Sequence, residues 1–402
     1  MESAFDAFNR GMGMTAVRDP YPRFAALRRR GPIQRIDLSD WYPPLNPPGE
    51  DPGAWVVLTH ALASEVLRDA ETFSSAKYAS TADAVMGRNL LSMDPPEHTR
   101  YRALVQKALT ARALAAWEQE LVRPVIRECV AALAGRGRAD LTADFTFRFP
   151  VRVIAGLFGV PDADLEDFHR WGVEIQCVLF DYERGVAASK KLTSCFRGVI
   201  EEHRRRPRGD LLTGLLQAEL DGRRLDEEEI LGFLRLLLPA GLETTYRGTS
   251  NLLFALLTHP EQLEAVRRDR SLVEAAVEEA MRWEPILTGG LRFATRDTRL
   301  AGVEIRAGEK IFVCFGSANR DETRYENADA FDIFRPPKPN LAFGFGPHRC
   351  LGMGLARLEM AAALEAVLDG LPELRLDPQA QDVHIMGEGF RAPASLPVVY
   401  GA

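Results

Sequence analysis

The longest run of helical periodicity in this chain covers residues 226–258, and it limits the folds that the chain can adopt. At about 1.5 Å per residue, one helix over this segment would be about 50 Å long, enough to cross a whole domain. Its most apolar part, residues 230–242, is interrupted by Arg235 and Pro239, so it does not match the ~18 uncharged residues of a membrane-spanning helix. We expect one long helix inside a soluble domain.

Most of the remaining chain also shows helical spacing, with a smaller number of strand-like runs. The sequence predicts helices over residues 20–30, 60–69, 97–109, 112–134, 151–158, 164–179, 184–206, 261–268, 271–283 and 351–369. It predicts strands over residues 33–36, 55–58, 291–293, 303–305 and 311–315, and loops over residues 42–52 and 318–349. Since helices and strands do not alternate, we expect a mainly α fold with a minor β-sheet region, not a Rossmann fold or a TIM barrel.

The charge balance argues against a nucleic-acid-binding protein. The 402 residues include 50 Lys and Arg against 57 Asp and Glu, a net charge of −7, whereas a nucleic-acid binder needs a basic footprint. The first residues mix acidic, basic and apolar side chains and lack a secretory signal pattern. No nucleotide-binding glycine motif occurs. We expect a cytoplasmic protein with neither a membrane segment nor a nucleic-acid partner.

The cysteines are few and widely spaced, which excludes a disulfide framework and a zinc cage. Four of them lie in apolar segments and are expected to be small buried side chains: Cys129, Cys177, Cys195 and Cys314. The fifth, Cys350, lies in a glycine-rich loop and has different surroundings.

The loop around Cys350 reads F-G-F-G-P-H-R-C-L-G-M-G-L-A-R over residues 343–357. Gly344 and Gly346 permit backbone angles that a Cβ atom would forbid, and we expect Cys350 at the start of a helix. Ionising a thiol of pKa ~8.5 at pH 7 costs about 2 kcal/mol, whereas a helix terminus supplies only ~0.3–1 kcal/mol. A bound metal would complete the deprotonation. A lone thiolate cannot form a zinc shell but can ligate a haem iron. A nucleophilic cysteine remains the alternative.

The F-G-x-G-x-H-x-C core of this loop resembles the cysteine-ligand signature of the cytochrome P-450 family, the haem-thiolate monooxygenases. The resemblance extends over nearly the whole chain. It implies a triangular helical prism with haem b between the long central helix and the cysteine-loop helix. It makes the Cys350 thiolate the axial iron ligand, and it gives cofactor contacts to Phe343, Gly344, His348 and Gly352 in the same loop.

The middle of the long helix reads A-G-L-E-T-T over residues 240–245, which places an acid and a hydroxyl in an apolar helix. Burying both without use would be costly. By resemblance this stretch faces the oxygen-binding side of the haem, where Ala240 and Gly241 let the cofactor approach and Glu243 and Thr244 deliver protons. The alternative for Thr244 is a hydroxyl that bonds the carbonyl four residues earlier. Pro239 should disturb the helix there.

Two further residue sets gain a role from the resemblance. Glu279 and Arg282 form an E-x-x-R pair on one helix face, and with Arg335 they imply a structural triad, although E-x-x-R recurs elsewhere in the chain. Haem propionates need cationic or hydrogen-bonding partners when buried. The residues implied for that role are His98, Arg102, Arg292 and His348.

A substrate chamber above the haem is also implied by the resemblance. Its walls are expected to be mostly apolar, which suits a hydrophobic small molecule. The implied wall residues are Val85, Leu90, Val178, Phe180, Leu237, Ala240, Leu287, Gly290, Leu291 and Phe390.

The implied reaction is insertion of one oxygen atom of O2 into the substrate, with two electrons from outside the chain. Flavin, nicotinamide and iron–sulfur motifs are absent from the sequence, so we expect a separate ferredoxin or flavodoxin with its NAD(P)H reductase. Arg112 and Arg349 would attract it near Cys350. The alternatives are a peroxygenase, which typically replaces the acid–hydroxyl pair, and a non-catalytic haem sensor or carrier.

Length alone suggests two or three domains. The motifs for one haem, however, extend from His98 to Cys350. We therefore expect residues 1–402 to form one haem-binding domain without a fused reductase, and a monomer.

Overall fold

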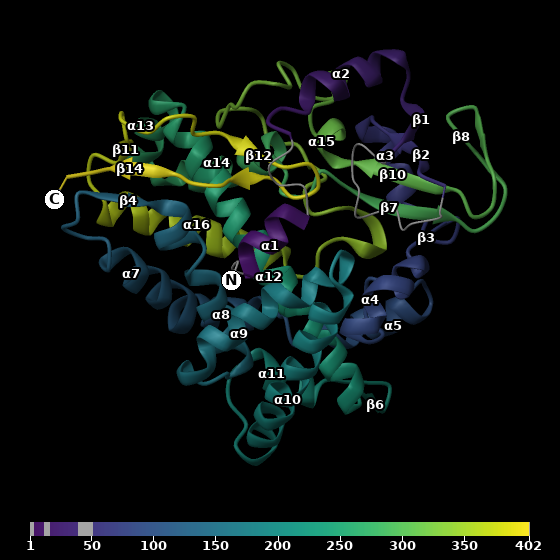
Figure 1. Ribbon diagram of the computed structural model, residues 1–402, viewed down its shortest axis with the longest axis horizontal. Helices are drawn as coiled ribbons and strands as arrows, with labels where there is room; N and C mark the ends of the chain where they lie inside the picture. The colour runs from purple at the N-terminus through teal and green to yellow at the C-terminus, as the bar shows by residue number, and fades with distance from the viewer. Residues whose placement is uncertain (1–3, 12–16, 39–50, 402) are drawn as a thin grey trace.

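The computed structural model describes residues 4–11, 17–38 and 51–401. Helix α12 (Glu227–Leu257) confirms the predicted long helix and lies near the centre of the molecule (Figure 1). A capping box defines its start, because Asp226 Oδ1 accepts from the Glu229 amide at 2.8 Å and Glu229 Oε2 accepts from the Asp226 amide at 3.0 Å. The helix continues through Pro239.

Within the described residues, fifteen further labelled helices place α12 inside a helical assembly, and α12 packs directly against α8, α10, α14 and α16. The helices before α12 are α1 (Ala4–Gly11), α2 (Tyr21–Arg30), α3 (His60–Arg68), α4 (Ala79–Met86), α5 (Glu97–Gln106), α6 (Ala111–Trp117), α7 (Arg123–Ala131), α8 (Phe149–Phe158), α9 (Leu165–Glu174), α10 (Tyr182–Arg205) and α11 (Leu211–Gln217). Those after it, within the described residues, are α13 (Pro260–Arg268), α14 (Val273–Trp283), α15 (Phe315–Ala318) and α16 (Met353–Gly370).

The predicted helix over 112–134 is divided. A π-helical segment, Glu118–Val122, joins α6 to α7. Pro124 follows at the start of α7, and since proline has no N–H it cannot bond the carbonyl of Glu120, which favours a locally widened turn. The predicted helix over 164–179 likewise ends as α9, with a 3-10 segment over Ile175–Leu179. Helices α1, α4, α11 and α15 were not predicted.

The largest sheet has the strand order β1-β2-β10-β7-β3 and lies to one side of α12, opposite helices α7 to α11 (Figure 1). Its strands are β1 (Ile33–Asp37), β2 (Gly53–Val57), β3 (Phe73–Ser74), β7 (Gly289–Ala294) and β10 (Lys310–Cys314). Only the β2–β10 pair is parallel, and the β7–β10 register sets Arg292 opposite Ile311. The fold is mainly α with small sheets, as predicted.

The smaller sheets lie outside this core. One combines β11 (Arg375–Leu376), β14 (Pro397–Val399) and β4 (Arg138–Asp140). The remaining pairs are β5 (Glu219–Leu220) with β6 (Arg223–Arg224), β8 (Thr298–Leu300) with β9 (Val303–Ile305), and β12 (Ile385–Met386) with β13 (Ala392–Pro393). The predicted proline-rich loop over 42–52 lies outside the described residues except for its last two positions.

All five cysteines are free thiols, and Cys129, Cys177 and Cys314 are buried as predicted. Cys195 is half-buried and Cys350 is exposed. Within residues 4–11, 17–38 and 51–401, no helix is long and apolar enough to cross a membrane.

Candidate functional site

The cysteine loop is a tight turn seated against the end of α3. Gly346 has φ of +70°, and a Cβ atom there would lie 2.2 Å from the carbonyl oxygen of Leu67. Gly344 also has positive φ, at +67°. Both observations explain why glycine is needed here. The Cys350 amide donates to the carbonyl of Phe343 at 2.8 Å, which closes the turn.

Cys350 lies three residues before α16 and not at its first position, because Leu351 and Gly352 form a turn that precedes Met353. Burial raises the pKa of the Cys350 thiol, while the backbone N–H groups of Gly352 and Met353 and the positive charges of Arg102 and Arg357 oppose that rise. The side chain is nevertheless exposed by surface area. A bound metal at this exposed thiol would deprotonate it outright.

Four cationic or hydrogen-bonding side chains meet beside Cys350. His98 and Arg102 lie one turn apart on α5, Arg292 comes from β7, and His348 comes from the cysteine loop. The rings of His98 and His348 have centroids 4.1 Å apart. The charges of Arg102 and Arg292 both act on His348, and Arg102 also interacts with Cys350. The four predicted propionate residues are therefore brought together.

The two histidines of this cluster have ring nitrogens without the hydrogen-bond partners that buried polar groups normally have. His98 is 1% exposed, yet neither of its ring nitrogens has a hydrogen-bond partner in the described part of the chain. His348 Nε2 is also unpartnered there. Burial and the nearby arginines lower the pKa of His98 to about 4 and that of His348 to about 3. An anionic group with hydrogen-bond acceptors, such as the propionates of haem, fits this cluster.

In the middle of α12, the side chain of Ala240 is exposed although the helix is otherwise largely buried. Thr244 Oγ1 donates to the Ala240 carbonyl at 2.6 Å, which is the local hydrogen bond considered as an alternative. The open side of Gly241 faces elsewhere, since a Cβ atom there would lie 2.7 Å from Ile154 Cδ1 on α8. The small size of Gly241 thus serves packing against α8, and its predicted contact with the cofactor stays a prediction.

Glu243 is held in a fully buried ion pair that sequence reasoning missed. Its Oε2 accepts from Arg247 Nε at 3.1 Å and from Arg247 Nη2 at 2.9 Å, and both side chains are 0% exposed. Burial raises the pKa of the Glu243 carboxyl and Arg247 opposes that rise. The i,i+4 spacing was a readable signal for this pair.

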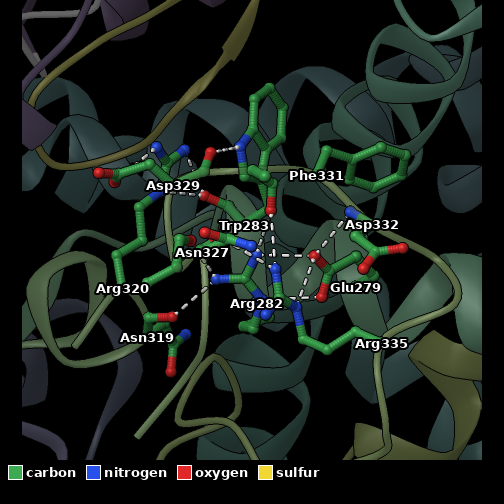
Figure 2. Close-up of polar contacts among 12 residues, drawn as sticks. Glu279, Arg282, Trp283, Asn319, Arg320, Asn327, Asp329, Phe331, Asp332 and Arg335 are labelled. Atoms are coloured by element: carbon green, nitrogen blue, oxygen red, sulfur yellow. Dashed lines mark hydrogen bonds and ion pairs between the residues drawn. The ribbon is translucent and has the colours of Figure 1, made fainter. Parts of the chain in front are cut away.

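The predicted triad is also assembled, as Figure 2 shows. Arg282 Nε and Nη2 bind the two oxygens of Glu279, each at 2.7 Å, and Arg335 Nε lies 3.4 Å from Glu279 Oε1. Arg282 also donates to the carbonyls of Asn319 and Ala328 at 3.0 and 2.7 Å. This network anchors the loop before the cysteine motif and holds no exposed reactive group.

The predicted chamber residues are spread over several elements. Leu287 forms an isolated β-bridge with Phe390, so these two lie side by side. Phe390 is half-buried and Phe180 is 40% exposed. Val85, Leu90 and Leu291 are buried, Ala240 is exposed, and four members are half-buried: Val178, Leu237, Leu287 and Gly290. Arg357 Cζ, on α16, lies 4.9 Å from the ring centroid of Phe343 in the cysteine loop.

Comparisons with known proteins agree with this geometry. A family model described as cytochrome P-450 matches residues 177–391. The chain is 36% identical over 380 residues to the cytochrome P-450 monooxygenase PikC of Streptomyces venezuelae, covering 91% of this chain and 87% of PikC.

Solved structures give the same result. The chain superposes on cytochrome P-450 CYP109Q5 from Chondromyces apiculatus with a TM-score of 0.86 and 35% identity, over 96% of each chain. It superposes on CYP109E1 from Bacillus megaterium, solved in complex with testosterone, with a TM-score of 0.85 and 30% identity, covering 96% of this chain and 100% of CYP109E1. The arrangement of the thiol, the histidine and arginine cluster and the long helix agrees with these comparisons. The chain belongs to the cytochrome P-450 family, the haem-thiolate monooxygenases.

Proposed function

We propose that Cys350 is the thiolate ligand of haem b in this monooxygenase and that Arg102, Arg292, His98 and His348 hold the propionates. The observation that carries this is the cluster of two arginines and two histidines with unpartnered ring nitrogens beside the one exposed thiol among the five cysteines. When bound by these residues, haem would supply the activation of dioxygen, in which one oxygen atom enters the substrate and the other leaves as water with the uptake of two electrons and two protons.

The protein's own contribution at the long helix is the supply of those protons. Glu243 holds an exchangeable carboxyl group, and Thr244 holds a hydroxyl that is directed at the Ala240 carbonyl. Rotation about the Thr244 Cα–Cβ bond would release this hydroxyl to bind water or oxygen. Retention of the acid–hydroxyl pair supports a monooxygenase over a peroxygenase or a haem carrier. Residues 1–402 are proposed to form one haem-binding domain, active as a cytoplasmic monomer.

The substrate is proposed to be a hydrophobic small molecule that contacts Leu237, Leu287, Phe180 and Phe390. The support is the apolar character of these side chains and the paired placement of Leu287 and Phe390. Testosterone, the molecule bound in the CYP109E1 complex, is a suitable first probe. A spin-state titration with testosterone and a chemically diverse apolar library would measure the preference.

Electrons are proposed to come from a ferredoxin or flavodoxin, itself reduced by an NAD(P)H reductase. Arg112 and Arg349 are both exposed, and Arg349 is adjacent to Cys350, so together they can attract an acidic partner. Arg112→Glu should raise the KM for ferredoxin and leave substrate binding unchanged. Arg136→Glu, on the loop before β4, is the matched control with the same charge change. Equal effects of the two variants would contradict this docking face.

The ferrous–CO absorption spectrum tests the haem assignment. The purified protein should give the strongly red-shifted Soret band of thiolate-ligated haem, and Cys350→Ser should lose it. Cys195→Ser, at a half-buried cysteine away from the loop, should keep it. A Cys350→Ser protein that retained the band would remove Cys350 as the ligand. Turnover with hydrogen peroxide as efficient as with NADPH would favour the peroxygenase.

A further inference from the structure

The N-terminal helix α1 reaches the buried ion pair of the long helix. Asn9 Oδ1 accepts a hydrogen bond from Arg247 Nη2 at 2.9 Å, across 238 positions of sequence. The neighbouring Phe8 is 0% exposed, and its ring packs edge-on against Phe390 at 6.0 Å. Gly11 also fits closely on Phe180, since a Cβ atom there would lie 2.5 Å from that ring. Helix α1 is therefore seated on residues of the proposed substrate chamber.

The ion pair itself is asymmetric. Arginine usually binds a carboxylate as a fork, with one N–H to each oxygen. In this pair both Nε and Nη2 of Arg247 bind the same oxygen, Glu243 Oε2. Glu243 Oε1 has no hydrogen-bond partner in the described part of the chain, although the side chain is 0% exposed. A buried carboxylate oxygen without a partner requires an explanation.

Asn9 explains why Glu243 Oε1 lacks a partner, because Arg247 Nη2 donates to both Asn9 Oδ1 and Glu243 Oε2. The aromatic rings of Tyr246 and Phe390 flank the guanidinium, with centroids 4.7 and 5.6 Å from Arg247 Cζ. These contacts define one orientation of the guanidinium. Without Asn9, Nη2 would be able to turn toward Oε1 and complete the fork.

We propose that Asn9 is a positioning residue that acts on Glu243 through Arg247. By holding Arg247 Nη2 on the Asn9 side, Asn9 leaves Glu243 Oε1 available to exchange protons during oxygen reduction. Helix α1 thereby contributes to proton supply on the oxygen-binding side of the haem. This inference rests on the proposed role of Glu243 in proton supply. It assigns to the N-terminal helix a task that the sequence motifs did not indicate.

The test removes the Asn9 acceptor and follows proton-dependent steps. Asn9→Leu deletes the acceptor at similar volume, and Asn9→Asp retains an acceptor oxygen. The control Arg10→Gln changes the exposed neighbour on the same helix. NADPH oxidation by the haem-loaded enzyme, with a surrogate ferredoxin and reductase, is measured with and without testosterone. The readouts are the fraction of electrons recovered as hydrogen peroxide and the solvent deuterium isotope effect on the rate.

We expect Asn9→Leu to raise the peroxide fraction and the solvent deuterium isotope effect by roughly threefold or more, a change within the range of coupling energies between residues in contact. Asn9→Asp and Arg10→Gln should stay near the wild type in both measurements. In a Glu243→Gln background Asn9→Leu should add nothing further. Near-ultraviolet circular dichroism reports whether α1 stays seated, and Asn9→Ala, without the branched apolar side chain, repeats the test if it does not.

The outcomes separate this inference from the proposed function. If Glu243→Gln raises peroxide release while Asn9→Leu and Asn9→Ala leave both readouts at the wild-type values, only the role of Asn9 is overturned. Additive effects of Asn9→Leu and Glu243→Gln would also overturn it, because Asn9 would then act by another route. If Glu243→Gln itself behaves as the wild type, the proton-supply role of Glu243 and the inference built on it both fail.

Discussion

The rings of His98 and His348 lie with centroids 4.1 Å apart, although one belongs to α5 and the other to the cysteine loop. Both carry ring nitrogens without a hydrogen-bond partner in the described part of the chain, and burial, together with Arg102 and Arg292, lowers the pKa of both. Four groups of this kind would repel one another or remain unsatisfied without an anion between them. The arrangement therefore suits a ligand with acidic groups.

Removing one of these cationic groups should weaken haem binding. Arg102→Leu deletes a charged hydrogen-bond donor, and such bonds contribute about 1.5–3 kcal/mol, which corresponds to a loss of about 10–100-fold in haem affinity. The rate and extent of haem transfer to apomyoglobin measure the loss. Arg112→Leu, at an exposed position on α6, is the matched control and should bind haem as the wild type does. Equal transfer from both variants would contradict the propionate assignment.

Gly346→Ala should disrupt the cysteine loop. The added methyl group would overlap the Leu67 carbonyl oxygen, 2.2 Å away, and φ of +70° is unfavourable for alanine. We expect a fall in haem content and in Tm. Gly135→Ala is the control, because its φ is +78° but the space around it is open, so it carries the backbone strain of about 1 kcal/mol alone. A Gly346→Ala protein as stable as Gly135→Ala would show that the loop can move away from α3.

Arg282→Met should lower the free energy of unfolding by about 3–5 kcal/mol, because it leaves the Glu279 carboxylate buried without its main partner. Urea unfolding measures the change. The exposed pair of Glu201 and Arg205 provides the contrast, with side chains 66% and 74% exposed, and Arg205→Met should cost about 0–1 kcal/mol. If the two variants were equally stable, the Glu279–Arg282 pair would not be structural.

His169 should make the protein less stable as the pH falls. Burial lowers the pKa of His169 to about 4 from its ordinary value of 6.5, so the unfolded chain binds a proton that the folded chain resists. The free energy of unfolding should therefore decrease as the pH drops from about 6.5 to about 4, by up to about 3 kcal/mol. Urea unfolding of the wild type and His169→Phe at several pH values checks this. A pH dependence that is unchanged in His169→Phe would refute it.

Local signals were sufficient where the chain's own neighbours decide the structure. The capping box of Asp226 and Glu229 defines where α12 begins, and the apolar period carries it to Leu257. The π-helical segment before α7 depends on the missing N–H of Pro124, which the spacing of apolar residues does not report. Helix α1 was missed because its eight residues depend on contacts with α9 and the segment that follows it.

The sequence allowed the chemical types of the site residues to be predicted, but not which side chains contact one another. A lone cysteine among loop glycines and an acid beside a hydroxyl in an apolar helix were visible as chemical patterns, and the resemblance related them to one cofactor. The pairing of Glu243 with Arg247 was within reach of helical spacing, whereas Asn9 was not, because no local rule connects α1 to α12.

By itself, the sequence determined most of the longer helices, the mainly α class and the kinds of side chain expected to meet a haem. Only the tertiary structure decided that His98 lies on His348, that Gly241 faces Ile154, and that Arg247 binds one oxygen of Glu243 and not two. The physical reason is the separation along the chain over which each kind of interaction acts. Backbone hydrogen bonds and apolar periods act over a few residues, whereas these contacts form when segments far apart in the chain are packed together and desolvated.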